Sequence, residues 1–411
     1  MAADAIATLN TPEWRALPSE EKVRRYYSAL ELPTHCNPDR IRQRLSREYS
    51  AQFRQFKEVI ARRTEGDFSE DVYTLKNSSL RFSLLVGALE RGEMHAKFLE
   101  ALDNYAPSPR AILDVGCENG SLTCFYALKW PSARVIGLDP CPEAIARARE
   151  LAARLRLTNT EFVQGAARDI RRVIGNRGFD LILTVTVLHE AKMFPPDNDL
   201  VVMPAACFSP RAITEPITEI AAIADTLAGP RAQWIAAERC HSPATFWWWS
   251  RVFDLVGLGI DWPKSDRIMV SGDQEKLTIL VASPSAPRPL NPDLALGFWI
   301  CNEFNRWGGN PAWAVLDCLA EALFARLNPK TCMERIVARD ADGGELHRIE
   351  VWVSGPLALY YAADKYGKSE LQFRALTDLA AMREHWREMA SALRKDAPDS
   401  VRFEALEAPS P

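Results

Sequence analysis

The chain has 411 residues, of which 47% are hydrophobic and 25% charged, with a formal net charge of −4. This composition is ordinary for a globular protein, and the length predicts two or three domains. The slightly acidic net charge gives no support for nucleic-acid binding by the surface as a whole, but it is compatible with a local basic patch. The nine cysteines have no C-x-x-C spacing, so we expect buried, reduced thiols and neither a disulfide framework nor a metal site.

The start of the chain, Met1–Ile6, has neither a basic segment nor an apolar segment of the kind that directs secretion. No apolar run approaches the roughly 18 residues of a membrane span. We therefore expect a cytoplasmic protein without a membrane partner.

Residues 1–100 are predicted to be helical. Proline near a first turn with acids just inside it marks helix starts at Thr11 and Pro18. Apolar residues at helical spacing predict one long amphipathic helix over Arg40–Arg62. Another helix is predicted over Leu80–Tyr105, broken or bent near Gly92.

The most informative stretch is Ala111–Thr123, followed by Val135–Asp139. An apolar strand ends in an acid and is followed by a glycine turn and a helix, and a second apolar strand ends in Asp139. This is the form of a Rossmann-like nucleotide-binding half. It does not suit a dinucleotide, because Glu118 stands at the second glycine position of G-x-G-x-x-G, and the chain has no P-loop.

The string "LDVGCENG…GLDP" resembles motif I and the following acidic strand end of class I S-adenosylmethionine (SAM)-dependent methyltransferases. The resemblance continues through the strands Thr160–Gln164 and Phe179–His189 to the terminal hairpin Arg267–Val270 and Lys276–Ala282. It covers residues 101–285. It implies an α/β fold with a seven-stranded Rossmann-like methyltransferase sheet, with SAM as cofactor and S-adenosylhomocysteine as product.

The resemblance also implies which residues bind the cofactor. Asp114 would support the turn and the ammonium end of SAM, and Asp139 would accept both ribose hydroxyls, unless it is only the N-cap acid of the next helix. The full set of cofactor-binding positions is Asp114, Gly116, Cys117, Gly120, Asp139, Cys141, Ala166, Ala167 and Thr184. The helical segment of residues 1–100 is either a cap packed beside the sheet or a lid over the SAM site that forms part of the substrate pocket, and the resemblance to small-molecule members of the family implies the second role.

Two residues depart from the family pattern. Glu118 replaces a glycine, so its side chain either crowds the methionine end of SAM or faces the ammonium group. Ala166 stands where many relatives have an acid that accepts the adenine amino group, and Asp169 is a neighbour that can replace it.

His189 and Glu190 end the fourth strand, near the place where the methyl group is transferred in this family. A histidine there can remove a proton from the acceptor, because its pKa lies near working pH. The alternative is a structural histidine, since many methyl transfers need only in-line positioning of the acceptor. We name His189 and Glu190 as the catalytic candidates.

Two further segments have more than one interpretation. Ala191–Pro216 contains five prolines with Met and Phe residues, and is either a loop over the substrate or a packed surface excursion. Three consecutive tryptophans in Phe246–Ser250 cannot share one helix face. They either pack against a domain or a second subunit, as in a homodimer, or stack on the substrate.

A proline-rich linker, Pro284–Pro292, separates the methyltransferase segment from residues 293–411. These are predicted to form a smaller C-terminal α+β domain of unknown role. We expect helices over Leu294–Phe304 and Ala312–Leu327, and a final helix from Asp378 to Leu393. The strands are expected at Arg335–Ala338, Leu346–Val353, Leu357–Ala362 and Glu370–Arg374.

The sequence therefore predicts an enzyme that transfers a methyl group from SAM to a small-molecule acceptor of the kind found in secondary metabolism. Two alternatives stay open. One is a protein or nucleic-acid methyltransferase whose C-terminal domain docks the substrate, and the other is a non-catalytic SAM-binding scaffold.

Overall fold

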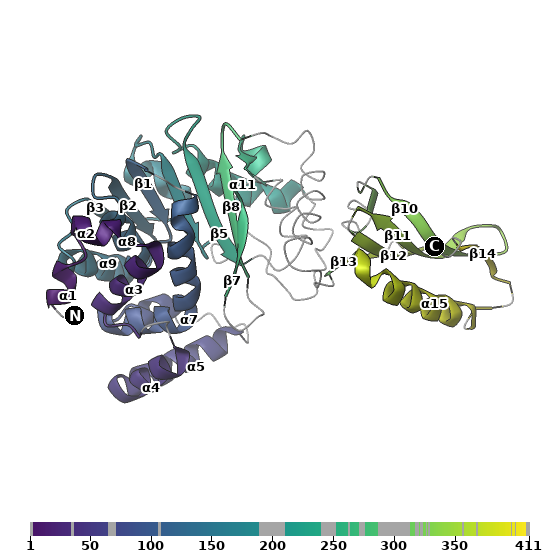
Figure 1. Ribbon diagram of the computed structural model, residues 1–411, viewed down its shortest axis with the longest axis horizontal. Coiled ribbons are helices and arrows are strands. Elements are labelled where there is room, and N and C mark those ends of the chain that lie inside the picture. Colours follow the sequence, from purple (N-terminus) through teal and green to yellow (C-terminus); the bar gives the residue numbers. More distant parts are fainter. Residues whose placement is uncertain are drawn as a thin grey trace. The chain divides into compact units, whose positions relative to one another are not determined.

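A computed structural model describes residues 3–188, 210–239, 252–286 and 313–407, apart from short gaps at 34–36, 65–70, 106–107, 262–263, 271–275, 317–319, 321–323, 326, 328, 356, 367–368, 396 and 399. The chain forms two compact units (Figure 1). The N-terminal unit comprises Met1–Met193, Thr218–Arg239 and Ile260–Ala286, and the C-terminal unit comprises the rest. The predicted division into residues 1–100, 101–285 and 293–411 stays a prediction.

The predicted helices of residues 1–100 are present. They are α1 (Ala3–Ala7), α2 (Pro12–Ala16), α3 (Ser19–Ala29), α4 (Pro38–Glu48), α5 (Ser50–Thr64), α6 (Val72–Lys76) and α7 (Leu80–Ala101). The single helix predicted over Arg40–Arg62 is wrong, because Tyr49 leaves the helical conformation and packs its ring 5.4 Å from that of Phe82. Of the break or bend predicted near Gly92, the break is wrong: α7 is continuous there, since packing around the buried glycine outweighs its low helix propensity.

The N-terminal unit is built on a mixed sheet with the strand order β3-β2-β1-β4-β5-β8-β6, and β7 also pairs with β8. Strands β1 to β5 are parallel, and β8 is antiparallel to both β5 and β7. Their bounds are β1 Ala111–Val115, β2 Arg134–Asp139, β3 Thr160–Gln164, β4 Leu181–Val185, β5 Gln233–Arg239, β6 Gly259–Ile260, β7 Asp266–Met269 and β8 Lys276–Ser283. The predicted fold and its terminal hairpin are confirmed, with the two-residue β6 as an addition to the seven expected strands.

A short 3-10 helix, η2 (Leu102–Asn104), follows α7 and precedes β1. The helices between the parallel strands are α8 (Ser121–Lys129), α9 (Pro142–Arg154), η3 (Ala167–Asp169), α10 (Ile170–Ile174) and α11 (Pro210–Ala224). Helices α8 and α9 contact β2 and β3. Helix α11 begins at Pro210, so the end of the predicted loop Ala191–Pro216 is helical, and proline suits a first helical position.

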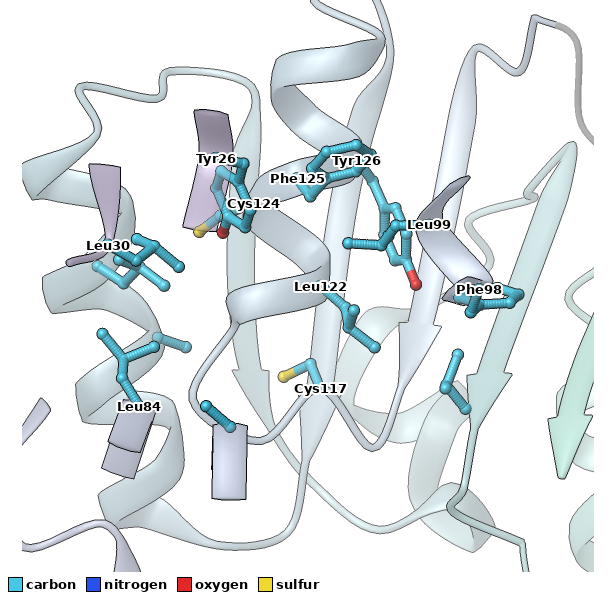
Figure 2. Packing of buried hydrophobic residues seen from close by; sticks show 14 of the residues in the cluster. Tyr26, Leu30, Leu84, Phe98, Leu99, Cys117, Leu122, Cys124, Phe125 and Tyr126 are labelled. Atoms are coloured by element: carbon cyan, nitrogen blue, oxygen red, sulfur yellow. The ribbon is translucent and has the colours of Figure 1, made fainter. Parts of the chain in front are cut away.

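The N-terminal helices share one hydrophobic core with the sheet. Figure 2 shows side chains of this core, with Tyr26 beside Phe125 of α8. Their ring centroids lie 5.3 Å apart in an edge-to-face arrangement, and Trp14 contacts Phe125 in the same way at 5.8 Å. The Tyr26 hydroxyl also donates to the carbonyl oxygen of Ser121 at 2.6 Å. Helices α2 and α3 are therefore packed directly on the helix that follows the glycine turn.

The C-terminal unit contains a six-stranded antiparallel sheet with the order β14-β10-β11-β12-β13-β9. The elements are β9 Trp313–Leu316, β10 Thr331–Arg339, β11 Glu345–Ser354, β12 Leu357–Asp364, β13 Ser369–Ala375, η5 Leu376–Asp378, α15 Leu379–Lys395 and β14 Arg402–Glu407. Helix α15 packs on β11 and β12, with Met382 and Trp386 in the core. The predicted strands and the last helix are confirmed.

One C-terminal prediction is wrong and one element was missed. Trp313–Leu316 lies in the helix predicted over Ala312–Leu327 but forms strand β9, because pairing with β13 outweighs the local preference of this short apolar run. Strand β14 was not predicted. None of the helices in the described part of the chain has the length and apolar character needed to cross a bilayer.

Candidate functional site

The turn between β1 and α8 has an unusual backbone. Gly116, Glu118 and Gly120 all have positive φ angles, of 76°, 48° and 75°. A Cβ atom on Gly116 would lie 2.3 Å from the Val187 side chain, and one on Gly120 would lie 2.8 Å from Ala148 of α9. Glycine is therefore required at both positions, for backbone conformation and for close approach.

Asp139 ends β2 beside this turn. Its Oδ2 accepts a hydrogen bond from the backbone N–H of Glu118, and its Oδ1 accepts one from Cys141, both at 2.9 Å. The residue is 9% exposed, and burial raises its pKa to about 6 although these two N–H bonds lower it. Each carboxylate oxygen keeps a lone pair for a ligand. The N-cap of α9 is Cys141, not Asp139.

Asp114 is buried one residue before the end of β1. Its Oδ2 accepts a hydrogen bond from the Thr123 hydroxyl at 2.5 Å, which ties β1 to α8. Burial raises the pKa of Asp114 to about 7, against the hydrogen bond that lowers it. The structure thus brings Asp114 to the helix after the turn.

The remaining predicted cofactor positions differ in their placement. Cys117 and Cys141 are buried, and the Cys141 Sγ lies 3.5 Å from Glu143 Oε2. Ala166 and Ala167 follow β3 at the start of η3. The nearby Asp169, considered as a replacement acid, is ion-paired with Arg172 at 3.3 Å. Thr184 is fully buried and accepts a hydrogen bond from Trp234 Nε1 at 3.0 Å, so its hydroxyl faces the interior.

The end of β4 is held by two side chains that the sequence did not single out. Thr186 has a φ of 53°, and its hydroxyl accepts a hydrogen bond from Arg91 of α7 at 3.0 Å. The buried Glu238, at the end of β5, accepts the backbone N–H groups of Val187 and Leu188 at 2.8 and 2.9 Å. The candidates His189 and Glu190 come next and lie outside the described residues, as do Phe246–Ser250 and the part of the predicted loop before Pro210.

The N-terminal helices reach the turn through two polar connections. Lys76 Nζ, at the end of α6, lies 2.8 Å from Glu118 Oε1 and 2.8 Å from Glu90 Oε2. Asn119 Nδ2 donates to the Ser83 hydroxyl of α7 at 2.9 Å. These contacts place residues of α6 and α7 at the carboxyl end of β1, as the lid interpretation of residues 1–100 requires.

Burial lowers the pKa of Lys76, but the carboxylates of Glu118 and Glu90 raise it by more, so it stands above its ordinary value. Lys76 therefore carries its charge inside the protein. Sequence reasoning missed it, because a lysine at the end of a short helix is usually solvated. Among the described residues no group of His, Cys, Asp and Glu side chains is arranged to hold a metal ion.

These residues fit the chemistry of SAM. The turn offers a close backbone approach, and Asp139 presents a carboxylate that is oriented by two N–H groups and retains free lone pairs. Such a group suits a pair of ribose hydroxyls. The acid at the strand end and the glycine turn lie at the carboxyl edge of a parallel sheet, where open α/β sheets bind ligands.

Comparison with known proteins shows where the resemblance lies. Residues 112–202 match the family described as Methyltransferase domain. Malonyl-[acyl-carrier protein] O-methyltransferase of Acetivibrio thermocellus is 36% identical over 92 residues, which cover 22% of this chain and 30% of that protein. Trans-aconitate 2-methyltransferase of Streptomyces avermitilis is 32% identical over 99 residues, or 24% and 36% of the two chains. The predicted resemblance is thus confirmed over this segment.

The chain spans about a third of the length of these curated relatives. A solved structure with a similar fold is a SAM-dependent methyltransferase from Aquifex aeolicus, with a TM-score of 0.34 and 15% identity over 47% of this chain and 92% of that one.

Proposed function

We propose that this protein is a SAM-dependent methyltransferase that acts on a small-molecule acceptor. The observation that carries the proposal is the Asp139 carboxylate, held by the backbone of the glycine turn at the end of β2, inside the segment that matches a methyltransferase domain. The proposal draws further support from the names of the two relatives, both of which are methyltransferases.

In this proposal the residues around the turn divide the cofactor between them. Asp139 accepts the ribose hydroxyls, and the turn from Gly116 to Gly120 approaches the methionine end. Cys141, Ala166 and Ala167 line the adenine side, as the family resemblance implies. Bound SAM would supply an electrophilic methyl group.

The chain's own task is then to orient the acceptor and to accept its proton. Glu238 fixes the backbone at Val187 and Leu188, immediately before His189. A histidine placed after this fixed segment is the candidate base that takes the acceptor's proton at a ring nitrogen, with Glu190 as its neighbour. Helices α6 and α7 would cover the site, and the cytoplasm is the expected compartment.

The first experiment measures binding and transfer separately. We expect saturable binding of SAM and of S-adenosylhomocysteine to the full chain in calorimetry. With methyl-labelled SAM in a lysate, we expect label to enter the low-mass fraction. Absence of SAM binding would reject the proposal, whereas label in protein or RNA would replace its acceptor class by a macromolecule.

The second experiment tests His189. If it is the base, His189→Ala lowers turnover by about 10²–10⁴-fold while SAM affinity is unchanged. A loss below about tenfold would assign His189 to positioning or structure.

A further inference from the structure

Glu118 occupies the position where relatives have a glycine, yet its side chain is not turned away from the site. Its backbone has a φ of 48° and its N–H holds Asp139, so the residue is fixed in the middle of the turn. Its Oε1 is buried and lies 2.8 Å from the ammonium group of Lys76. The departure from the pattern is therefore accompanied by a partner from another element.

Lys76 is buried more deeply than a surface ion pair requires. Its side chain is 4% exposed, and it is placed between Glu118 and Glu90 at 2.8 Å from each. Burying an ammonium group is costly unless it is paired, and one carboxylate would be enough to neutralise it. The second carboxylate is therefore not needed to neutralise Lys76, and the cluster keeps hydrogen-bonding groups that are not used up by charge pairing.

Counting the hydrogen-bond donors of Lys76 and the acceptors of Glu118 shows which of these groups are unused. An ammonium group has three N–H bonds, and Lys76 donates one of them to Glu90 Oε2, whereas its contact with Glu118 Oε1 at 2.8 Å is an ion pair without hydrogen-bond geometry. In the described part of the chain, no other group binds Lys76 Nζ, and nothing binds Oε2 of Glu118. Lys76 therefore keeps a donor and Glu118 keeps an acceptor, and the backbone N–H of the same Glu118 holds Asp139.

We propose that Lys76 and Glu118 together recognise the amino-acid end of the cofactor: Lys76 binds its carboxylate and Glu118 binds its ammonium group. This inference rests on the proposed function, and it assigns specificity to two residues outside the glycines and the ribose acid. A donor and an acceptor of opposite charge are complementary to a zwitterion, and the amino-acid end is the only zwitterionic part of SAM. Glu118 is then a replacement for the missing glycine with a function of its own.

A second buried lysine in the same unit provides the matched control. Lys129, at the end of α8, has a side chain that is 5% exposed and pairs with a single carboxylate, that of Asp103. Substitution of either lysine by methionine keeps the apolar stem and leaves a carboxylate without its partner. Both variants are expected to lose stability, but only Lys76→Met removes a group that meets the ligand.

The experiment compares three probes on the full chain by calorimetry. S-Adenosylhomocysteine has both the carboxylate and the ammonium group, decarboxylated SAM lacks the carboxylate, and 5′-methylthioadenosine lacks both. We expect Lys76→Met to weaken S-adenosylhomocysteine by about tenfold or more, and to leave the other two probes within about twofold of wild type. Glu118→Gly should weaken the two probes that carry an ammonium group and spare 5′-methylthioadenosine.

The control Lys129→Met and the second variant Glu118→Gly distinguish a loss of ligand contacts from a loss of stability. Lys129→Met should bind all three probes as wild type does. If Lys76→Met does not fold, Glu118→Gly decides, because glycine tolerates the positive φ at this position. Equal weakening of all three probes in either variant, or no weakening, overturns the inference while SAM binding by wild type stands. Failure of wild type to bind S-adenosylhomocysteine overturns the proposed function as well.

Discussion

The N-terminal and C-terminal units both bury acidic side chains, but they neutralise them in different ways. In the C-terminal sheet, Glu334 of β10 accepts from Arg383 of α15 at 2.5 Å, and Glu350 of β11 accepts from Arg335 at 2.5 Å. Each acid thus has an arginine in fixed contact. Pairs of this kind hold a strand to a helix or to its neighbour.

Two buried acids of the N-terminal unit, Asp114 and Asp139, have no such cation in hydrogen-bond contact among the described residues. Asp139 accepts only backbone N–H groups and Asp114 only a hydroxyl in the described part of the chain. Burial raises their pKa values to about 6 and about 7. Buried carboxylates with perturbed pKa values at the edge of a parallel sheet are typical of ligand sites, whereas arginine-paired ones are typical of structure. On the proposed function, the difference would distinguish acids that bind the ligand from acids that stabilise the fold.

The largest effect should come from breaking a C-terminal pair. Glu334→Ala leaves Arg383 buried without its carboxylate, so we expect the C-terminal unit to lose about 3–5 kcal/mol of unfolding free energy. Chemical denaturation followed by circular dichroism measures this loss. Affinity for S-adenosylhomocysteine should not change.

Glu404→Ala is the matched control, because Glu404 pairs with Arg339 in the same sheet but is 64% exposed. An exposed pair contributes about 0.2–1 kcal/mol. If both variants lose the same small unfolding free energy, the buried pair stabilises the fold no more than the exposed one, and arginine pairing does not give the buried acids of the C-terminal unit a structural role.

Asp139→Ala should weaken ligand binding and leave the fold intact, which is the opposite of the result expected for Glu334→Ala. Hydrogen bonds to a charged group contribute about 1.5–3 kcal/mol, so we expect SAM affinity to fall by about 2 kcal/mol or more with the fold intact. Calorimetry checks the affinity, and far-ultraviolet circular dichroism checks the fold.

Asp180→Ala controls for the loss of backbone hydrogen bonds. Asp180 accepts the N–H groups of Arg110 and Ala111 at the amino end of β1, at 2.8 and 3.2 Å, so it has the same kind of contacts at the other edge of the sheet. SAM affinity should be unchanged in this variant. An unchanged affinity in Asp139→Ala would remove that residue from the site.

These contrasts also show how much of the molecule could be predicted from sequence. Strands β1 and β2 and the acid Asp139 were predicted, because apolar runs that end in an acid and a glycine turn are local patterns. The contact of Lys76 with Glu118 was not, since it joins the end of α6 to a turn that is distant along the chain and depends on how α6 packs. Glu238 was missed for the same reason, although it ends an apolar strand as Asp139 does. Strand β9 was predicted to be helical, because the sequence pattern does not contain its pairing with the distant strand β13.

A pair of glycines sharpens the comparison within the N-terminal unit. Gly116 and Gly175 both have positive φ angles, of 76° and 69°, but an added Cβ meets Val187 only at Gly116 and nothing within 4 Å at Gly175. Alanine at either position costs about 1–2 kcal/mol for its backbone conformation. At Gly116 overpacking should add about 1–3 kcal/mol. Equal unfolding midpoints of the two variants would show that the turn has room that the structure does not indicate.

The effect most specific to Asp114 and Asp139 is the dependence of stability on pH. The folded-state pKa values of Asp114 and Asp139 stand above the ordinary value of about 3.9, so the ligand-free protein binds more protons than the unfolded chain between about pH 4 and pH 7. The contribution of these two groups to stability is therefore fully present at low pH and is lost as pH rises through about 6 and about 7.

Ligand affinity should change in the opposite direction. Asp139 accepts ribose hydroxyls best when ionised, so affinity for S-adenosylhomocysteine should fall as pH drops below about 6. Measurement of affinity between about pH 5 and pH 8 in wild type and in Asp139→Asn tests this, because the variant cannot titrate there and its affinity should be low but flat. A wild-type affinity that rises as pH falls would mean that the protonated acid binds the ligand, and Asp139 would then donate a hydrogen bond to the ribose instead of accepting two.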